Sequence, residues 1–314
     1  MTVRFAAPCL APAILALATF LAAAVAGAEE APQPPASQPA AASAQKSGAQ
    51  SGRGNAANSP PAAEQRRLPE DSTTKQTIAL PGRTLSFNAT AGSIRLFNDK
   101  GEPQADIAYT SYLLDGADAR NRPVTFFFNG GPGASSAYLQ LGNAGPWRLS
   151  IDGEAAISSA AADLKPNAET WLDFTDLVFI DPVATGYSRF VATDEDVRKR
   201  FFSIDGDVNA LAVAIRRWLE KSDRLLSPKF IVGESYGGIR GPKIVRELQT
   251  GQGVGVRGLI LVSPVLDFRE YGGSSLLQYV ASLPSMAAVA RQAKAPVTRT
   301  DMADVVIGRE TDVP

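Results

Sequence analysis

The segment KFIVGESYGG, residues 229–238, joins a short apolar run to a turn built around a serine. The run 229–234 has the length and the Val, Ile and Phe content of a buried strand. Gly233 and Gly237 stand two positions on either side of Ser235, and the residues that follow can begin a helix. A serine on such a tight strand-to-helix turn is held in a strained conformation, with its hydroxyl beside a helix N-terminus that favours negative charge. The segment therefore predicts a nucleophilic serine, although an ordinary strand-to-helix turn is the alternative.

A glycine-rich loop about a hundred residues earlier supplies what such a nucleophile needs. In FFFNGGPGASSAY, residues 126–138, an apolar run stops at Asn129 and gives way to NGGPG. Attack on a carbonyl requires backbone N–H donors for the developing oxyanion, one from the residue after the serine and one from a loop after an earlier strand. We therefore predict Tyr236 and Gly131 as the two donors. Taken alone, the loop could equally be a plain glycine-rich turn.

The apolar runs of the chain indicate the fold class. Four short runs, 124–129, 176–181, 229–234 and 257–263, are typical of parallel strands covered on both faces. Between the second and third runs, residues 204–224 carry apolar side chains every three or four positions, as an amphipathic helix does. Alternating runs before residue 115 are typical of antiparallel strands. The order predicts an α/β fold with a mixed, mostly parallel sheet and helices on both faces.

The N-terminal part divides into two segments that lie outside this fold. Residues 1–28 combine Arg4, a long apolar stretch and a small-x-small pair, Ala26 and Ala28, which is the layout of a signal peptide. We expect an exported protein, periplasmic or secreted, without a stable membrane span after cleavage; a transmembrane anchor is the alternative. Residues 29–72 are rich in Ala, Pro, Gln, Ser and Gly, which predicts a disordered linker before a domain at 73–314.

The composition limits the kinds of catalytic and metal-binding chemistry that the chain can carry out. The chain contains no histidine, and its single cysteine, Cys9, lies within the predicted signal peptide. The mature chain would have no disulfide and no thiol nucleophile, and we expect no cofactor and no zinc or copper site. The net charge is −1 with no long basic run, which argues against nucleic acid as a partner. The sequence does not indicate an oligomeric state.

Four segments together carry a family resemblance. NGGPGASS, NAGPW, DLVFIDPVATGYS and FIVGESYGG occur in this order between about residues 80 and 266. They closely resemble the serine carboxypeptidases, an α/β-hydrolase family that removes C-terminal residues from peptides. The resemblance implies an α/β-hydrolase-type fold, a peptide substrate with a free C-terminal carboxylate, and an acyl-enzyme on Ser235.

The resemblance also assigns roles to particular residues. Ser235 matches the nucleophile, Gly131 and Tyr236 match the oxyanion donors, and Asn129 and Glu234 match residues that bind the terminal carboxylate. The implied substrate-binding set is Asn129, Gly130, Glu234 and Asn143. Asn143 is a departure, because the family has a second glutamate there that shares a proton with the first; a shifted alignment would bring Gln140 near that position instead. With a neutral amide, only Glu234 needs a proton to donate, so we hypothesise an altered pH dependence or specificity.

The catalytic triad is not complete within the chain. Hydrolases of this class place an acid and then a histidine after the serine, and residues 236–314 contain no histidine. Asp267 and Asp301 are available acids, but neither is assigned. The simplest interpretation is the N-terminal part of a longer hydrolase, and a truncated gene product would look the same. Three hypotheses follow: a secreted serine carboxypeptidase present as an incomplete chain, a non-catalytic peptide-binding relative, and an esterase or acyltransferase of the same fold.

Overall fold

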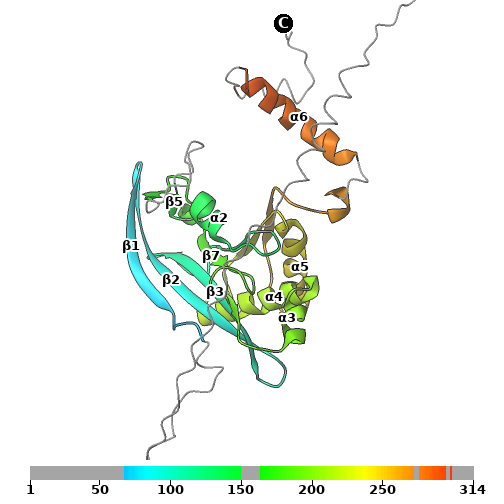
Figure 1. The fold of residues 1–314 in the computed structure, drawn as a ribbon. Coiled ribbons are helices and arrows are strands. Elements are labelled where there is room, and N and C mark those ends of the chain that lie inside the picture. The colour runs from blue at the N-terminus through cyan, green and yellow to red at the C-terminus, as the bar shows by residue number, and fades with distance from the viewer. Residues whose placement is uncertain (1–66, 150–162, 272–275, 295–297, 299–314) are drawn as a thin grey trace, which may run out of the picture. The chain divides into compact units, whose positions relative to one another are not determined.

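A computed structural model describes residues 67–149, 163–271, 276–294 and 298 of the chain (Figure 1). The predicted signal peptide and most of the predicted linker lie outside the described residues. None of the helices that the structure describes is long and apolar enough to cross a membrane.

The described chain contains ten strands and several helices. The strands are β1 (Ser72–Leu80), β2 (Arg83–Phe97), β3 (Pro103–Leu114), β4 (Val124–Phe128), β5 (Trp147–Leu149), β6 (Leu164–Pro166), β7 (Asp176–Ile180), β8 (Arg189–Phe190), β9 (Lys229–Glu234) and β10 (Gly258–Val262). The helices are α2 (Ala137–Leu139), α3 (Glu195–Phe201), α4 (Ile204–Lys221), α5 (Gly237–Thr250) and α6 (Leu277–Gln292), with the short turns η1 (Gln140–Ala144), η2 (Trp171–Asp173) and η3 (Phe268–Tyr271).

The main sheet is mixed, as predicted. Its strand order is β1-β2-β3-β7-β4-β9-β10, with β8 beside β3. The first three strands and β7 pair in antiparallel fashion, whereas β7, β4, β9 and β10 are mutually parallel. Phe127 of β4 stands opposite Phe179 of β7 and Val232 of β9, so the carboxyl ends of these three strands meet at one edge. Ligands of open α/β sheets bind at that edge.

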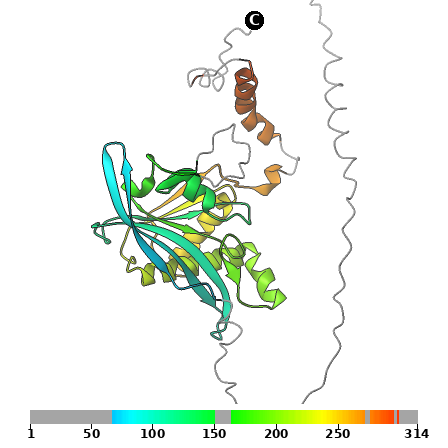
Figure 2. The ribbon, with the colours of Figure 1, turned by 60° about the vertical axis from the view of Figure 1, so that its left-hand side comes forward.

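Helices cover one face of the sheet because their apolar positions recur every three or four residues. Leu211, Ile215, Trp218 and Leu219 of α4 are fully buried against the sheet, together with Ile244 of α5. In both views α4 and α5 lie on the face opposite to α2 (Figures 1 and 2). The amphipathic helix predicted at 204–224 is confirmed with a slightly earlier end.

The other face carries an aromatic cluster. Phe87, Phe127, Phe179 and Tyr112 are buried there under Leu139, at the end of α2, and the turns η1 and η2. The rings of Phe127 and Phe179 stack with their centroids 4.6 Å apart. Because β4 and β7 are covered on both faces, every residue of each is buried, which explains why their sequences are apolar apart from Thr125 and Asp176.

The folded chain begins before the boundary predicted at residue 73. Leu68 is buried, and its N–H donates to the Asp106 carboxylate. Asp71 accepts from the Tyr109 hydroxyl and forms an ion pair of 2.6 Å with Lys221. These long-range contacts order the last residues of the segment predicted as linker, and they leave no trace in its local composition.

Candidate active site

Ser235 lies on the sharp turn between β9 and α5, with a φ of +56° that is uncommon for a residue with a side chain. Backbone hydrogen bonds hold this conformation. The Ser235 N–H donates to the Val262 carbonyl at 3.0 Å, and its carbonyl accepts from Gly238 and Val265 at 2.9 and 2.8 Å. The turn therefore has the strained backbone that places a nucleophilic hydroxyl at the edge of a sheet.

The glycine-rich loop, residues 129–136, lies directly against this turn. A Cβ on Gly130 would come within 2.6 Å of the Tyr236 nitrogen and 2.7 Å of the Ser235 Cβ, so only glycine fits. Gly131 has a φ of +104°. Within the part of the chain that the structure describes, neither the Gly131 nor the Tyr236 N–H makes a hydrogen bond. The two predicted oxyanion donors are thus both free to bind an external oxygen.

Asn129, Gly130 and Glu234 come together beside the serine. The Asn129 amide and the Gly130 N–H both donate to Oε2 of Glu234, at 3.0 and 3.1 Å. Asn129 is buried, and its Oδ1 accepts from the Leu139 N–H at 3.0 Å. One amide proton of Asn129 and the second oxygen of Glu234 remain for a ligand.

Sequence reasoning did not identify a buried ion pair behind this cluster. Arg240 of α5 is almost fully buried and pairs with Asp207 of α4 at 2.7 Å. Its Nη1 donates to the Asn129 carbonyl at 2.8 Å, and its guanidinium lies 4.9 Å from the centre of the Tyr236 ring. Burial raises the pKa of Asp207, although the Arg240 charge acts in the opposite direction. The sequence feature that could have indicated this pair is Arg240 itself, a charged residue on the inward face of the helix predicted after Ser235.

Asn143 makes no hydrogen bond to the carboxylate cluster among the described residues. It belongs to η1 and is exposed, and its backbone carbonyl accepts from the Asn167 side chain at 2.7 Å. Gln140 donates to the Tyr112 hydroxyl at 2.8 Å. Among the described residues, no hydrogen bond joins either side chain to Glu234. The structure therefore brings together Asn129, Gly130 and Glu234 but not Asn143.

A cavity of about 360 Å³ opens beside the two free donors. Pro132 and Gly133 of the loop and the Tyr236 ring form part of its wall, and the Phe268 ring stacks on Tyr236 at 6.0 Å between centroids. Burial, and then the nearby Asp207 carboxylate, raise the pKa of Tyr236. In the described residues, no group of three or more acidic, histidine or cysteine side chains could hold a metal ion.

A general base for Ser235 is not found in the described part of the chain, where no side chain is hydrogen-bonded to its hydroxyl. Asp267 is bound instead by Arg269 at 2.5 Å, and this hydrogen bond lowers the pKa of Asp267. Asp301 lies outside the described residues.

The strand order and the serine turn together define the α/β-hydrolase fold. Within this class, the family model described as serine carboxypeptidase matches residues 104–286, more than half of the chain. The chain belongs to the serine carboxypeptidase family.

The chain is similar to several individual proteins. Serine carboxypeptidase-like 13 of Arabidopsis thaliana is 27% identical over 195 residues, which cover 60% of this chain and 42% of the relative. A pheromone-processing carboxypeptidase of Leptosphaeria maculans is 31% identical over 169 residues, covering 48% of this chain and 23% of the relative. A solved prohormone-processing carboxypeptidase from Saccharomyces cerevisiae aligns with a TM-score of 0.46 and 15% identity, covering 72% of this chain and 54% of that one. The chain spans less than half the length of these two curated relatives.

Proposed function

We propose that this chain carries the nucleophile and the carboxylate-binding half of a serine peptidase that releases C-terminal residues from peptides. The observation that carries the proposal is the left-handed backbone of Ser235 near the N–H groups of Gly131 and Tyr236, neither of which is hydrogen-bonded within the described part of the chain. Donors arranged in advance around a developing oxyanion are a main source of rate enhancement in acyl transfer. A protein that only bound peptides would have no use for this strain.

The substrate class follows from the groups next to the serine. Asn129, Gly130 and Glu234 form a polar cluster, in which the Asn129 amide and the Gly130 N–H both donate to Glu234. The remaining amide proton of Asn129 can donate to a carboxylate, which accepts stronger hydrogen bonds than a neutral ester does. The cavity beside Tyr236 would receive the side chain of the acyl residue. We therefore place the free terminal carboxylate of a peptide at Asn129 and Glu234.

The chemistry needs a base that these residues do not supply. In the proposed reaction the Ser235 hydroxyl adds to the scissile carbonyl, its proton leaves with the amine, and the acyl-enzyme is hydrolysed by water. The chain contains no histidine. Without the base, an oxyanion hole and substrate binding still give a residual acceleration of about 10³–10⁴ over water. We expect the chain by itself to act in that range.

The proposal is tested by incubating the protein with an N-blocked dipeptide that has a free carboxylate, and with the same dipeptide amidated. Release of the C-terminal amino acid is followed by mass spectrometry. We expect slow release from the free dipeptide and none from its amide. Ser235→Ala should show only the release that the oxyanion hole and binding supply without a nucleophile. Asn129→Asp keeps the oxygen that accepts from Leu139 but places an anionic oxygen against Glu234, and it should abolish release.

A second candidate is a peptide-binding relative without catalysis. The observation in its favour is that no base contacts Ser235 in the described part of the chain. It predicts that the free dipeptide binds, that binding survives Ser235→Ala, and that no amino acid is ever released. Equal handling of the free and amidated dipeptides would contradict both candidates, because each depends on recognition of a carboxylate.

We also propose that the protein is exported by residues 1–28. Support comes from the apolar stretch and from Ala26 and Ala28 before Glu29. The absence of cysteine from the remaining chain means that its folding would not depend on an oxidising compartment.

A further inference from the structure

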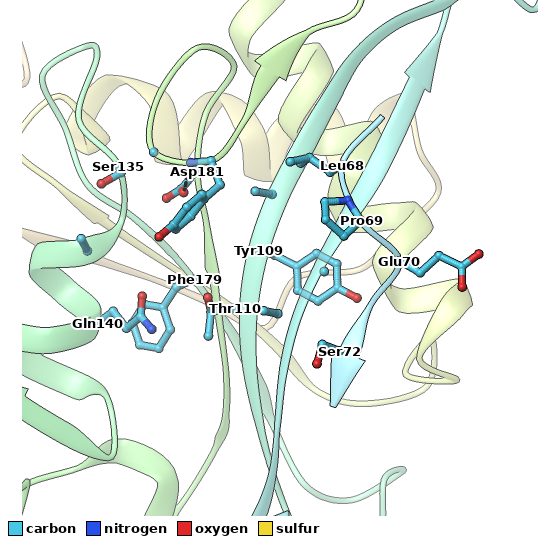
Figure 3. A pocket seen from close by; sticks show the side chains of 16 residues that line it. Leu68, Pro69, Glu70, Ser72, Tyr109, Thr110, Ser135, Gln140, Phe179 and Asp181 are labelled. Atoms are coloured by element: carbon cyan, nitrogen blue, oxygen red, sulfur yellow. Dashed lines mark hydrogen bonds between the residues drawn. The ribbon is translucent and has the colours of Figure 1, made fainter. Parts of the chain in front are cut away.

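A second cavity, of about 390 Å³, is lined by Ser135 of the glycine-rich loop and by residues of the first strands, and it takes no part in the proposed reaction. Figure 3 shows Ser135 and Asp181 on one side of it and Leu68, Pro69 and Tyr109 on the other. Its volume falls within the range of about 300–1,000 Å³ that is usual for small-molecule sites. We call it the Asp181 cavity.

The Asp181 cavity holds a carboxylate without a counter-ion. Asp181 follows β7, and its two oxygens accept from the N–H groups of Ser136 and Tyr187 at 3.0 and 3.1 Å. A carboxylate offers about four acceptor positions, so roughly two remain. No ion pair involves Asp181 in the described residues, and no lysine or arginine is among those that line the cavity. Burial raises the pKa of Asp181, while the two backbone hydrogen bonds act to lower it.

The remaining walls favour a cation with an apolar body. The aromatic rings of Tyr109, Phe179 and Tyr187 line the cavity together with Leu68 and Ala108, and Glu70 adds a second carboxylate at the edge. Aromatic faces attract ammonium groups within about 6 Å. Lys221 lies 5.7 Å from the Tyr109 ring, but its charge is already paired with Asp71 at 2.6 Å.

We propose that the Asp181 cavity binds a small organic cation, an ammonium group carried on an aromatic or aliphatic body, with the charge at Asp181 and the body against the rings. The proposal does not depend on any reaction at Ser235. Asp181 also accepts a hydrogen bond from the N–H of Ser136, at the end of the glycine-rich loop. Ser136 is five positions after Gly131, one of the two proposed oxyanion donors, so the same loop contacts both sites.

Calorimetric titration with benzylammonium, and with neutral benzyl alcohol of the same shape, tests the site at pH 7. We expect benzylammonium to bind at least about tenfold more tightly. Asp181→Asn should remove this difference, because it removes the charge while keeping the size of the side chain. Asp205→Asn is the matched control, since Asp205 is an exposed carboxylate elsewhere on the surface. It should leave both affinities unchanged.

A surface variant keeps the test decisive if Asp181→Asn does not fold. Tyr187 is 78% exposed, so Tyr187→Ala should fold. It should weaken the binding of benzylammonium about two- to fivefold, which is the effect of losing one cation–π contact. Tyr138→Ala is its control, because Tyr138 is also exposed but lies outside the cavity. Equal affinity for the two probes, no binding of benzylammonium, or affinity unchanged by both Asp181→Asn and Tyr187→Ala would overturn the proposal.

Discussion

At the scale of single residues, the candidate site depends on how closely two backbone segments approach. Gly130 has no room for a Cβ because the Tyr236 nitrogen and the Ser235 Cβ stand within 2.7 Å of its position. The loop can therefore present the Gly131 N–H beside the Tyr236 N–H only while residue 130 is glycine. The lack of a side chain at one position thus sets the geometry of both proposed donors.

Gly130→Ala should consequently lower both activity and stability. The added methyl pushes the loop away from the serine turn, and loss of one oxyanion donor costs about 10²–10³ in kcat. Gly255→Ala is the matched control, because a Cβ at Gly255 meets nothing within 4 Å and its backbone does not have a positive φ. Dipeptide turnover at the wild-type rate in Gly130→Ala would contradict the proposed oxyanion hole.

Asp181 makes a pH-dependent contribution to stability. Its pKa is raised above the ordinary value of 3.8, so the folded protein holds this proton more tightly than the unfolded chain does. The contribution is therefore largest at low pH and is lost as the pH rises from about 4 through the raised pKa. The free energy of unfolding of the wild type, from urea titrations, should fall relative to that of Asp181→Asn over this interval. If the free energy of unfolding changed with pH by the same amount in the two proteins, the raised pKa of Asp181 would be contradicted.

At the scale of elements, the pair between Arg240 of α5 and Asp207 of α4 links two helices to the loop. Both side chains are largely buried, and Arg240 also donates to the Asn129 carbonyl. The pair thus connects the helix that follows Ser235 with the residue proposed to bind the substrate carboxylate.

Arg240→Ala should destabilise the protein by about 3–5 kcal/mol, because it leaves Asp207 buried without its partner. Removing both side chains in Arg240→Ala/Asp207→Ala should restore a large part of that loss. Lys199→Ala, which breaks an exposed pair with Asp196 on α3, should cost only about 0.3–0.5 kcal/mol. Urea titration gives all three values, and a double variant no more stable than Arg240→Ala would argue against the pairing.

Helices, strands and turns that leave a pattern in their own stretch of sequence could be predicted from the sequence. The strands β4, β7, β9 and β10 follow from short apolar runs, and α4 follows from its apolar spacing. The serine turn carries its own glycines, so its strained backbone was also predictable.

Features that depend on distant contacts could not be predicted in this way. Arg240 and Asp207 are 33 residues apart, and only the packing of α4 against α5 brings them together. The ordering of Leu68 depends on Asp106, which is 38 residues away. The position of Asn143 depends on the irregular turn η1, where counting from Asn129 does not determine the direction of a side chain.

At the scale of the whole molecule, the proposed nucleophile, the proposed donors and the carboxylate cluster all come from β4, β9 and their following loops. This arrangement explains how a chain that spans less than half the length of its Arabidopsis relative can contain all three of these groups. Export would be tested on the same scale: the N-terminal sequence of the protein recovered outside the cytoplasm should start at Glu29. A start at Met1 in that material would contradict cleavage after Ala28.

The central claim is that Ser235 is an acylated nucleophile, and intact mass spectrometry after reaction with an N-blocked amino-acid p-nitrophenyl ester tests it most directly. An activated ester lessens the need for a base during acylation, while hydrolysis of the acyl-enzyme stays slow without one, so the adduct should accumulate. The account predicts one acyl group per chain, on the peptide that contains Ser235, and none in Ser235→Ala. An unmodified chain, or an adduct that persists in Ser235→Ala, would contradict it.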